Sequence, residues 1–286
     1  MERFTHQWIA AILFSLVLAV PASSAEQRSW STSTGTAYTL PKGHWQKGLF
    51  DYLRYGQTDR LEWATHPVLD LVVPNLKVKV AHRQVHNWDL ATQYNFHYPT
   101  LLLRLLRREG IGGLIAPDPD IPEIPHIFSL RSEVLATRML NPSLWLTGKG
   151  GISVALKTAG DLDERTTIDI PVVFTRMATY YHGFQLNFGL GLDGDLSGRW
   201  AFSADTDIFL IPGQDESFAF ELRGWLSWSK SSRFRILFGY MLTYTVFPFG
   251  SQWQIMPYPV AFGPGARKLV FPMIDLQWAG QRKVKR

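Results

Sequence analysis

The stretch at residues 234–246, FRILFGYMLTYTV, decides the fold of this chain. Its even-numbered positions are all apolar or aromatic, whereas its odd-numbered positions include Arg235, Gly239, Thr243 and Thr245. Successive side chains of a β-strand point to opposite faces, so a period of two predicts a strand with one apolar and one polar face.

Three further runs share this alternation: residues 144–156, 184–192 and 200–210. Strands of soluble sandwiches are typically about 5 to 6 residues long, whereas a tilted strand needs about 10 residues to cross a bilayer. The polar faces are rich in Gly, Ser, Thr and isolated charges, which suits a crowded, wet lumen. The pattern therefore predicts an all-β fold, an antiparallel transmembrane β-barrel.

Strand-like runs fill the rest of the chain. They lie at residues 44–55, 61–65, 76–85, 89–98, 128–139, 170–180, 217–228 and 268–278. Bacterial single-chain barrels have even strand numbers, so we expect about 12 strands, with 10 or 14 as alternatives. Short polar turns alternate with long gaps at 106–126, 157–168 and 248–267, which are typical of extracellular loops. We expect a single barrel domain over residues 26–286.

The first 25 residues are typical of a secretory signal peptide. Arg3 gives a positive start, residues 8–20 are an unbroken apolar run, and small residues end at Ala25. The run is shorter than the ~20 residues of a membrane-spanning helix, although an uncleaved anchor is the alternative. We expect cleavage after Ala25, export, and a location in the bacterial outer membrane.

The composition excludes several classes of protein. Without any cysteine, the chain has no disulfides, no Cys-ligated zinc and no lipid-modified N-terminal cysteine. Its 11 Trp residues suit a membrane surface, and its net charge of +5 suits lipopolysaccharide phosphates. We expect outer-membrane lipid, lipopolysaccharide and the barrel-assembly machinery as partners. We expect no nucleic acid and no cofactor, and the oligomeric state stays open.

The segment at residues 53–63, LRYGQTDRLEW, resembles a recurring hairpin of bacterial outer-membrane barrels, in which an RYGLTDRLEL-like stretch joins two strands. It is similar to outer-membrane transporters found near aromatic-degradation pathways and to related barrels of unassigned function. Gln57 replaces an apolar residue of that family, and Trp63 replaces Leu. The resemblance implies the barrel fold and says little about cargo. Trp278 resembles the aromatic end of a last strand, although a basic tail follows it here.

Charged residues at polar-face positions are the candidates for lining the lumen. They are Lys77, Lys79, Arg83, Lys149, Asp205, Asp207, Glu221, Arg223 and Arg235. Mixed charges of this kind hold a barrel's interior together and tune ion selectivity. Asp118, Asp120 and Glu123 lie in the proline-rich stretch 117–125, a candidate loop that constricts the barrel mouth.

The sequence favours no catalytic or metal site. His82 and His86 are spaced as a helical metal pair, but on a strand they would lie about 13 Å apart. The carboxylates of stretch 117–125 are possible Ca²⁺ ligands, with solvated loop acids as the plainer interpretation. A Gly-x-Ser-x-Gly elbow is absent from the sequence. We therefore assign no catalytic, cofactor-binding or metal-binding residue.

Three functional hypotheses follow. The first is a passive channel or transporter for small molecules. The second is a structural or surface-interaction barrel with a closed lumen and functional loops. The third, an outer-membrane lipid-modifying enzyme, requires a Ser–His pair on the outer wall.

Overall fold

The computed structural model describes residues 35–105, 120–158, 160–163, 166, 175–212, 218–245, 252–261, 268–271 and 273–281. Its strands are β1 (His44–Gly48), β2 (Leu53–Thr58), β3 (Leu61–Thr65), β4 (Asn75–Ala81), β5 (Asp89–His97), β6 (Ile127–Asn141), β7 (Leu144–Lys157), β8 (Phe184–Ser197), β9 (Trp200–Leu210), β10 (Ala219–Ser231), β11 (Phe234–Thr245), β12 (Gln252–Met256), β13 (Tyr258–Ala261), β14 (Lys268–Phe271) and β15 (Ile274–Gln281). Its short helices are η2 (Leu69–Leu71), α2 (Thr100–Leu105) and α4 (Ala178–His182). No helix within these ranges is long and apolar enough to cross a membrane. The signal peptide expected over residues 1–25 lies outside the described residues.

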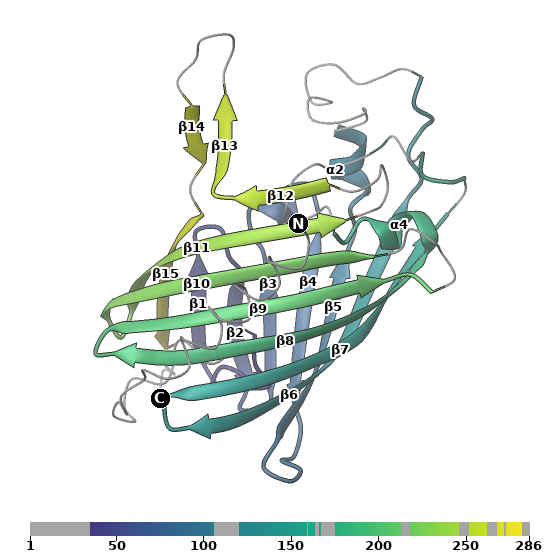
Figure 1. Cartoon of the computed structure of the whole chain (residues 1–286). Helices are drawn as coiled ribbons and strands as arrows, with labels where there is room; N and C mark the ends of the chain where they lie inside the picture. The colour runs from purple at the N-terminus through teal and green to yellow at the C-terminus, as the bar shows by residue number, and fades with distance from the viewer. Residues whose placement is uncertain are drawn as a thin grey trace, which may run out of the picture.

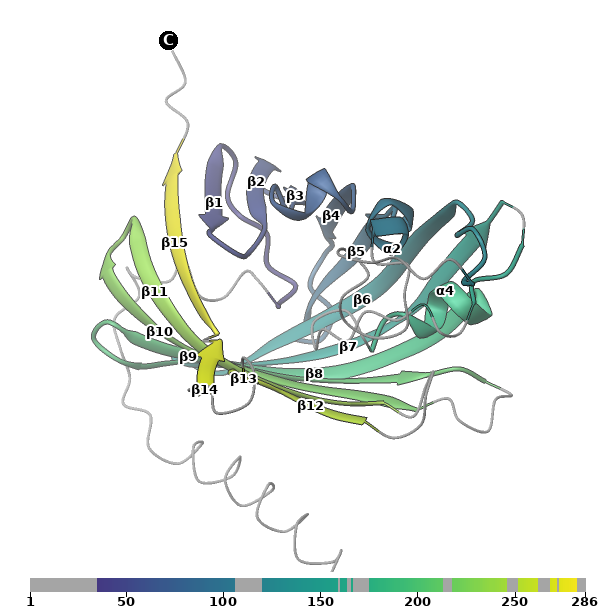
Figure 2. The same cartoon turned by 90° about the horizontal axis from the view of Figure 1, so that it is seen from above.

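The strands form a closed antiparallel barrel (Figure 1). From β1 to β11, each strand pairs with the next one along the chain. β15 pairs with β1 on one side and with β11 on the other, which closes the ring. Figure 2 shows this ring from above, with β1 to β4 opposite β8 to β11. The ring contains β1 to β11 and β15, so the predicted number of 12 strands is confirmed.

β12 and β15 are two parts of one barrel strand. β12 pairs with residues 241–245 of β11, and β15 pairs with residues 234–238. Between these parts, the backbone nitrogen of Gly239 donates to the Met273 carbonyl at 2.8 Å. The antiparallel hairpin of β13 and β14 is therefore an insertion into the last strand, and Figure 1 shows it projecting away from the barrel.

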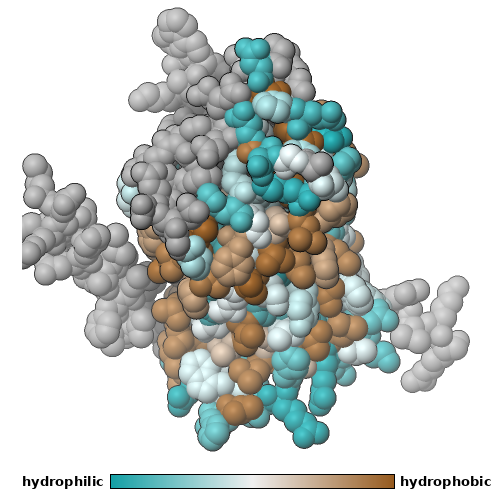
Figure 3. Space-filling view, turned by 90° about the vertical axis from the view of Figure 1, so that its right-hand side faces the viewer, coloured by the Kyte–Doolittle hydropathy of each residue, from teal (hydrophilic) through white to brown (hydrophobic). Residues whose placement is uncertain are grey.

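The two faces of β11 follow the alternation predicted from the sequence. Its odd-numbered positions are mostly buried, from Arg235 to Thr245, whereas Phe238 and Tyr240 on the other face are exposed. A band of hydrophobic residues crosses the middle of the molecule in Figure 3, between hydrophilic ends. The outer face is therefore apolar at mid-height, and the polar face points into the barrel.

Aromatic side chains mark the two edges of this band. Near the turn between β10 and β11, Phe234 packs against Trp278 with ring centroids 5.5 Å apart. Toward the other end of β11, Tyr244 packs against Trp253 at 4.7 Å. Ten residues separate Phe234 from Tyr244, which on a strand tilted by about 40° spans roughly 26 Å. This height matches the apolar band, about 25 Å tall, of a transmembrane barrel.

The two ends of the barrel differ, as the sequence predicts. At one end, two-residue turns join β2 to β3, β6 to β7, β8 to β9 and β10 to β11. The opposite end carries η2, α2 and α4. Three expected strands were wrong. Residues 44–55 form two strands, because a bend at 49–52 interrupts them. Residues 268–278 are divided between β14 of the inserted hairpin and β15 of the barrel. Residues 178–182 form the helix α4 instead of the end of a strand. Residues 170–174 lie outside the described residues.

Candidate functional site: the charged lumen

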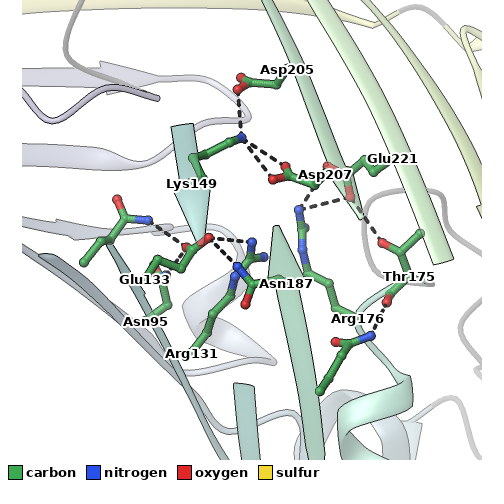
Figure 4. Close-up of polar contacts among 12 residues, drawn as sticks. Asn95, Arg131, Glu133, Lys149, Thr175, Arg176, Asn187, Asp205, Asp207 and Glu221 are labelled. Carbon is green, nitrogen blue, oxygen red and sulfur yellow. Dashed lines mark hydrogen bonds and ion pairs between the residues drawn. The ribbon is translucent and has the colours of Figure 1, made fainter. Parts of the chain in front are cut away.

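Lys149 of β7 bridges to two aspartates on β9, two strands away (Figure 4). Its ammonium lies 2.8 Å from Asp205 Oδ1 and 3.0 Å from Asp207 Oδ1. On the intervening strand, β8, Gly189 lies opposite both Lys149 and Asp207. A Cβ atom at Gly189 would lie 2.2 Å from Asp207 Oδ1 and 2.8 Å from Lys149 Cε. The absence of a side chain at Gly189 therefore lets this ion pair cross β8.

Glu133 of β6 is the centre of a second cluster. Its carboxylate oxygens accept hydrogen bonds from four side chains of β5, β6 and β8, namely Gln93, Asn95, Arg131 and Asn187, at 2.7 to 3.5 Å. β7 lies between Glu133 and Asn187, and its residue opposite both of them is Gly151. These bonds satisfy a buried carboxylate that would otherwise be costly to desolvate.

The segment before α4 is tied to the inner wall of the barrel. Glu221 of β10 accepts hydrogen bonds from Thr175 Oγ1 at 3.2 Å and from Arg176 Nη2 at 3.0 Å. Gln185 of β8 donates to the Thr175 carbonyl and accepts from Thr179 Oγ1 of α4. A loop from the long-loop end therefore reaches into the lumen and is held there by polar contacts.

An apolar cluster covers the inner side of this end. It consists of Leu103, Ile124, Ile127, Ala155, Leu162, Met177 and Tyr180. Burial raises the pKa of Tyr180 to about 12, so its hydroxyl stays protonated at neutral pH. The cluster joins α2, α4 and the segment before β6 into one packed unit.

At the short-turn end, the chain before β1 lies inside the barrel. Thr36, Ala37 and Leu40 are fully or almost fully buried. Ala37 packs against Ala91 of β5 and Leu135 of β6. We call residues 35–41 the N-terminal plug, because the segment enters the lumen at this end and buries three of its side chains there.

Hydrogen bonds from four strands hold the N-terminal plug. Lys79 Nζ donates to the carbonyls of Thr36 and Tyr38 at 3.0 and 3.1 Å. Further bonds join Ala37 N to Thr137 Oγ1 at 2.8 Å, Leu40 N to Glu62 Oε2 at 2.8 Å, and the Tyr38 hydroxyl to Asp89 Oδ2 at 2.9 Å. Burial and the Asp89 carboxylate raise the pKa of Tyr38 above its ordinary value, so the hydroxyl remains a donor.

Polar side chains also line the seam where the first and last strands meet. Arg54 forms two hydrogen bonds to Glu62 at 2.8 and 2.9 Å and one to Gln46 at 3.2 Å. Gln46 and Arg235 both donate to Gln277 Oε1 at 2.7 Å. Arg54 and Glu62 are the first arginine and the glutamate of the hairpin LRYGQTDRLEW, so this resemblance coincides with an inward-facing ion pair.

The structure places most of the predicted lumen-lining residues on inward faces. Lys77, Lys79, Lys149, Asp205, Asp207, Glu221, Arg223 and Arg235 all lie there. Arg83 does not, because β4 ends at Ala81 and Arg83 is exposed in the following turn. Asp120 and Glu123 are exposed, and Glu123 faces Arg104 of α2 at 3.6 Å. Asp118 lies outside the described residues, so the constricting role of this stretch stays a prediction.

Sequence reasoning missed several residues of the network. Arg131, Glu133 and Arg176 hold its centre but were not among the candidates. Arg131 and Glu133 are inward-facing positions of the predicted strand 128–139, so its alternation was the available signal. Arg176 lies outside any strand, and no periodic signal marks it. Within the described ranges, no group of three or more His, Asp or Glu side chains is arranged to hold a metal ion.

No model of a known protein family matches this chain, and no curated protein matches it. Several solved structures do. An outer membrane channel from Pseudomonas putida F1 is 10% identical, with a TM-score of 0.45, over 87% of this chain and 98% of that chain. OmpT, an outer membrane protein of Vibrio cholerae, is 6% identical, with a TM-score of 0.38, over 80% of this chain and 64% of that one. The P. putida toluene transporter TodX is 9% identical, with a TM-score of 0.34, over 85% of this chain and 78% of that chain.

The fold and the lumen together define a class of protein. A closed ring of 12 antiparallel strands has an apolar band outside and charged side chains inside. Such a ring pairs its backbone groups between strands, as a structure in lipid must. The chain is a transmembrane β-barrel of the outer-membrane type.

Proposed function

We propose that this barrel is a passive channel or transporter that moves small molecules across the outer membrane through its lumen. The outer wall then contacts outer-membrane lipid and lipopolysaccharide, and the charged inner wall faces the path. The N-terminal plug closes the short-turn end of that path, so transport requires the plug to move.

The observation that carries this proposal is how the N-terminal plug is held. It is not a strand of the barrel, and its backbone is bound by single side chains of the wall, such as Lys79 and Thr137. A neutral bond of this kind contributes only about 0.5 to 1.5 kcal/mol net, and one from the Lys79 ammonium about 1.5 to 3 kcal/mol, because water replaces the lost partner. Water that enters the lumen can therefore release the plug without breaking the barrel wall.

Solute uptake into proteoliposomes tests the proposal. Lys79→Met removes the two hydrogen bonds to Thr36 and Tyr38, and we expect small-solute uptake several-fold faster than in wild type. Thr137→Val removes one plug bond, from Ala37 N, together with the hydroxyl contact between Thr137 and Thr147. It provides a second plug variant in case Lys79→Met misfolds. Lys47→Met, at an exposed position of β1, is the matched control and should behave as wild type.

Heat-modifiable migration on a gel confirms that each variant is folded. If wild type and both plug variants admit solute no faster than empty liposomes, the transport proposal is wrong. The barrel would then be a structural or surface-interaction barrel with a closed lumen.

A further inference from the structure

Lys77 is an inward-facing cation of β4 that differs from its neighbours. Its ammonium lies over the ring of Tyr52, 4.3 Å from the ring centroid. Across the described part of the chain, no carboxylate lies within ion-pair distance of Lys77, and its ammonium contacts the ring of Tyr52 instead. By contrast, the lumenal cations Arg54, Arg131, Lys149, Arg176 and Arg223 each pair with a carboxylate.

The carboxylates that attract Lys77 from a distance are already occupied. They are Asp51, Glu133 and Glu62. Glu133 accepts four hydrogen bonds from its own cluster. Asp51 accepts from the backbone nitrogen of Tyr52 and from Gln277 Nε2, and Glu62 forms an ion pair with Arg54 at 2.7 Å. None of these carboxylates therefore neutralises Lys77 directly, and its ammonium donors are available to a ligand.

A second cation with spare hydrogen-bonding capacity lies at the same level. In the register of the sheet, Lys77 of β4 and Arg131 of β6 both lie opposite Asn95 of β5. The two cations therefore stand on either side of β5. Two strand spacings place their Cα atoms about 10 Å apart, a distance that both long side chains can bridge to one ligand. Arg131 donates Nη2 to Glu133, but its buried Nε finds no partner among the described residues.

Neutral and aromatic groups border these two cations. The guanidinium of Arg131 lies 5.3 Å from the ring centroid of Phe209. The ring of Tyr52 meets His66 edge-on at 5.6 Å. His97 faces the lumen from β5, within electrostatic reach of Lys77 and Arg131. The site thus combines positive charge with flat apolar surface.

From this geometry we infer that Lys77 and Arg131 form a binding site for a small carboxylate that carries an aromatic or other apolar group. The carboxylate accepts from the Lys77 ammonium and from the Arg131 guanidinium, and its apolar part lies against the ring of Tyr52. Phe209 is fully buried and supports Arg131 from behind. This inference rests on the proposed transport function and names the class of solute that the lumen selects.

Binding of phenylacetate to the purified full-length protein tests the inference. 2-Phenylethanol serves as the uncharged counterpart, and acetate as the carboxylate without an apolar group. Isothermal titration should give phenylacetate a Kd at least about tenfold lower than either, since one charge-assisted hydrogen bond has about that effect. Equal affinity for 2-phenylethanol, or for acetate, would overturn the proposed ligand class without any variant.

Variants then locate the site. We expect Lys77→Met to weaken phenylacetate binding about tenfold or more, Lys77→Arg to restore most of it, and Lys47→Met to leave it unchanged. Unchanged affinity in Lys77→Met would refute the assignment to Lys77. Uptake of a neutral solute is measured in parallel. Phenylacetate binding without any uptake refutes transport but keeps the site, whereas uptake without phenylacetate binding refutes the site but keeps transport.

Discussion

At the scale of single residues, two inward-facing glycines decide which polar side chains meet. Gly189 lies between Lys149 and Asp207, and Gly151 lies between Glu133 and Asn187. Each pair joins strands that are not neighbours in the sheet. A side chain at the glycine would occupy the space between the two contacting groups. Each glycine therefore permits a polar contact across its strand, although it carries no polar side chain itself.

This arrangement predicts that Gly189→Ala destabilises the barrel. The new Cβ would lie 2.2 Å from Asp207 Oδ1 and 2.7 Å from the Thr206 carbonyl oxygen, and the backbone atom cannot move away cheaply. We expect a loss of about 1 to 3 kcal/mol, measured as a lower urea midpoint of the heat-modifiable form. Gly148→Ala is the control, because nothing lies within 4 Å of its added Cβ. Equal midpoints for the two variants would show that the ion pair does not depend on Gly189.

The faces of lumenal residues could be predicted from the sequence, but their partners could not. The alternation with a period of two residues predicts that Lys149 and Asp207 both lie on the polar face. Their contact also depends on the register of three strands and on the glycine between them, which are properties of the sheet. Arg83 was assigned to the lumen because the alternation was continued past Ala81, where the strand ends.

At the scale of elements, the last barrel strand carries an inserted hairpin. Met256 lies opposite Met241, and Ile274 lies opposite Phe238. In this register, Pro257 and Met273 fall opposite Tyr240 and Gly239. Pro257 and Met273 therefore take consecutive positions in the wall of the barrel, and β13 and β14 are not part of that wall.

We predict that deletion of residues 258–272 leaves a folded barrel. Joining Pro257 to Met273 makes one continuous strand in the register of both halves, and antiparallel pairing with β11 is kept. The deleted protein should remain heat-modifiable in membranes, with a urea midpoint close to that of wild type. A control deletion of residues 258–271 retains one extra residue and shifts the register, which reverses the faces of one half, so it should fold poorly. If the protein without residues 258–272 does not fold, the assignment of this segment as an insertion is wrong.

The sequence predicted long, alternating strands well and short elements poorly. β6 to β11 have 11 to 15 residues each. The alternation of apolar and polar residues repeats often enough in them to identify each one as a strand. β12 has five residues inside a stretch expected to be a loop. In α4, the structure depends on contacts of Thr179 and Tyr180 with the barrel. The local sequence pattern does not reveal these contacts.

At the scale of the whole molecule, two expectations about strands cancelled in the count. The bend at 49–52 splits one expected strand into two, and the expected strand at 170–180 ends as a helix. The total of 12 is correct because one strand was gained and one was lost. The N-terminal plug could not be predicted, since its burial depends on contacts with Thr137 and Lys79, far away in the chain.

The central claim is that solute passes through the lumen when the N-terminal plug moves. The chain has no cysteine, so Ala37→Cys with Thr137→Cys introduces one defined pair. These positions are joined by a hydrogen bond of 2.8 Å from Ala37 N to Thr137 Oγ1, close enough for a disulfide to lock the plug to β6.

The decisive measurement is small-solute uptake into proteoliposomes that contain this double variant, before and after reduction, with each single-cysteine variant as control. The account predicts slow uptake in the oxidised form, faster uptake after reduction, and no response to the reductant in either control. Uptake that is the same in the oxidised and reduced forms would contradict it.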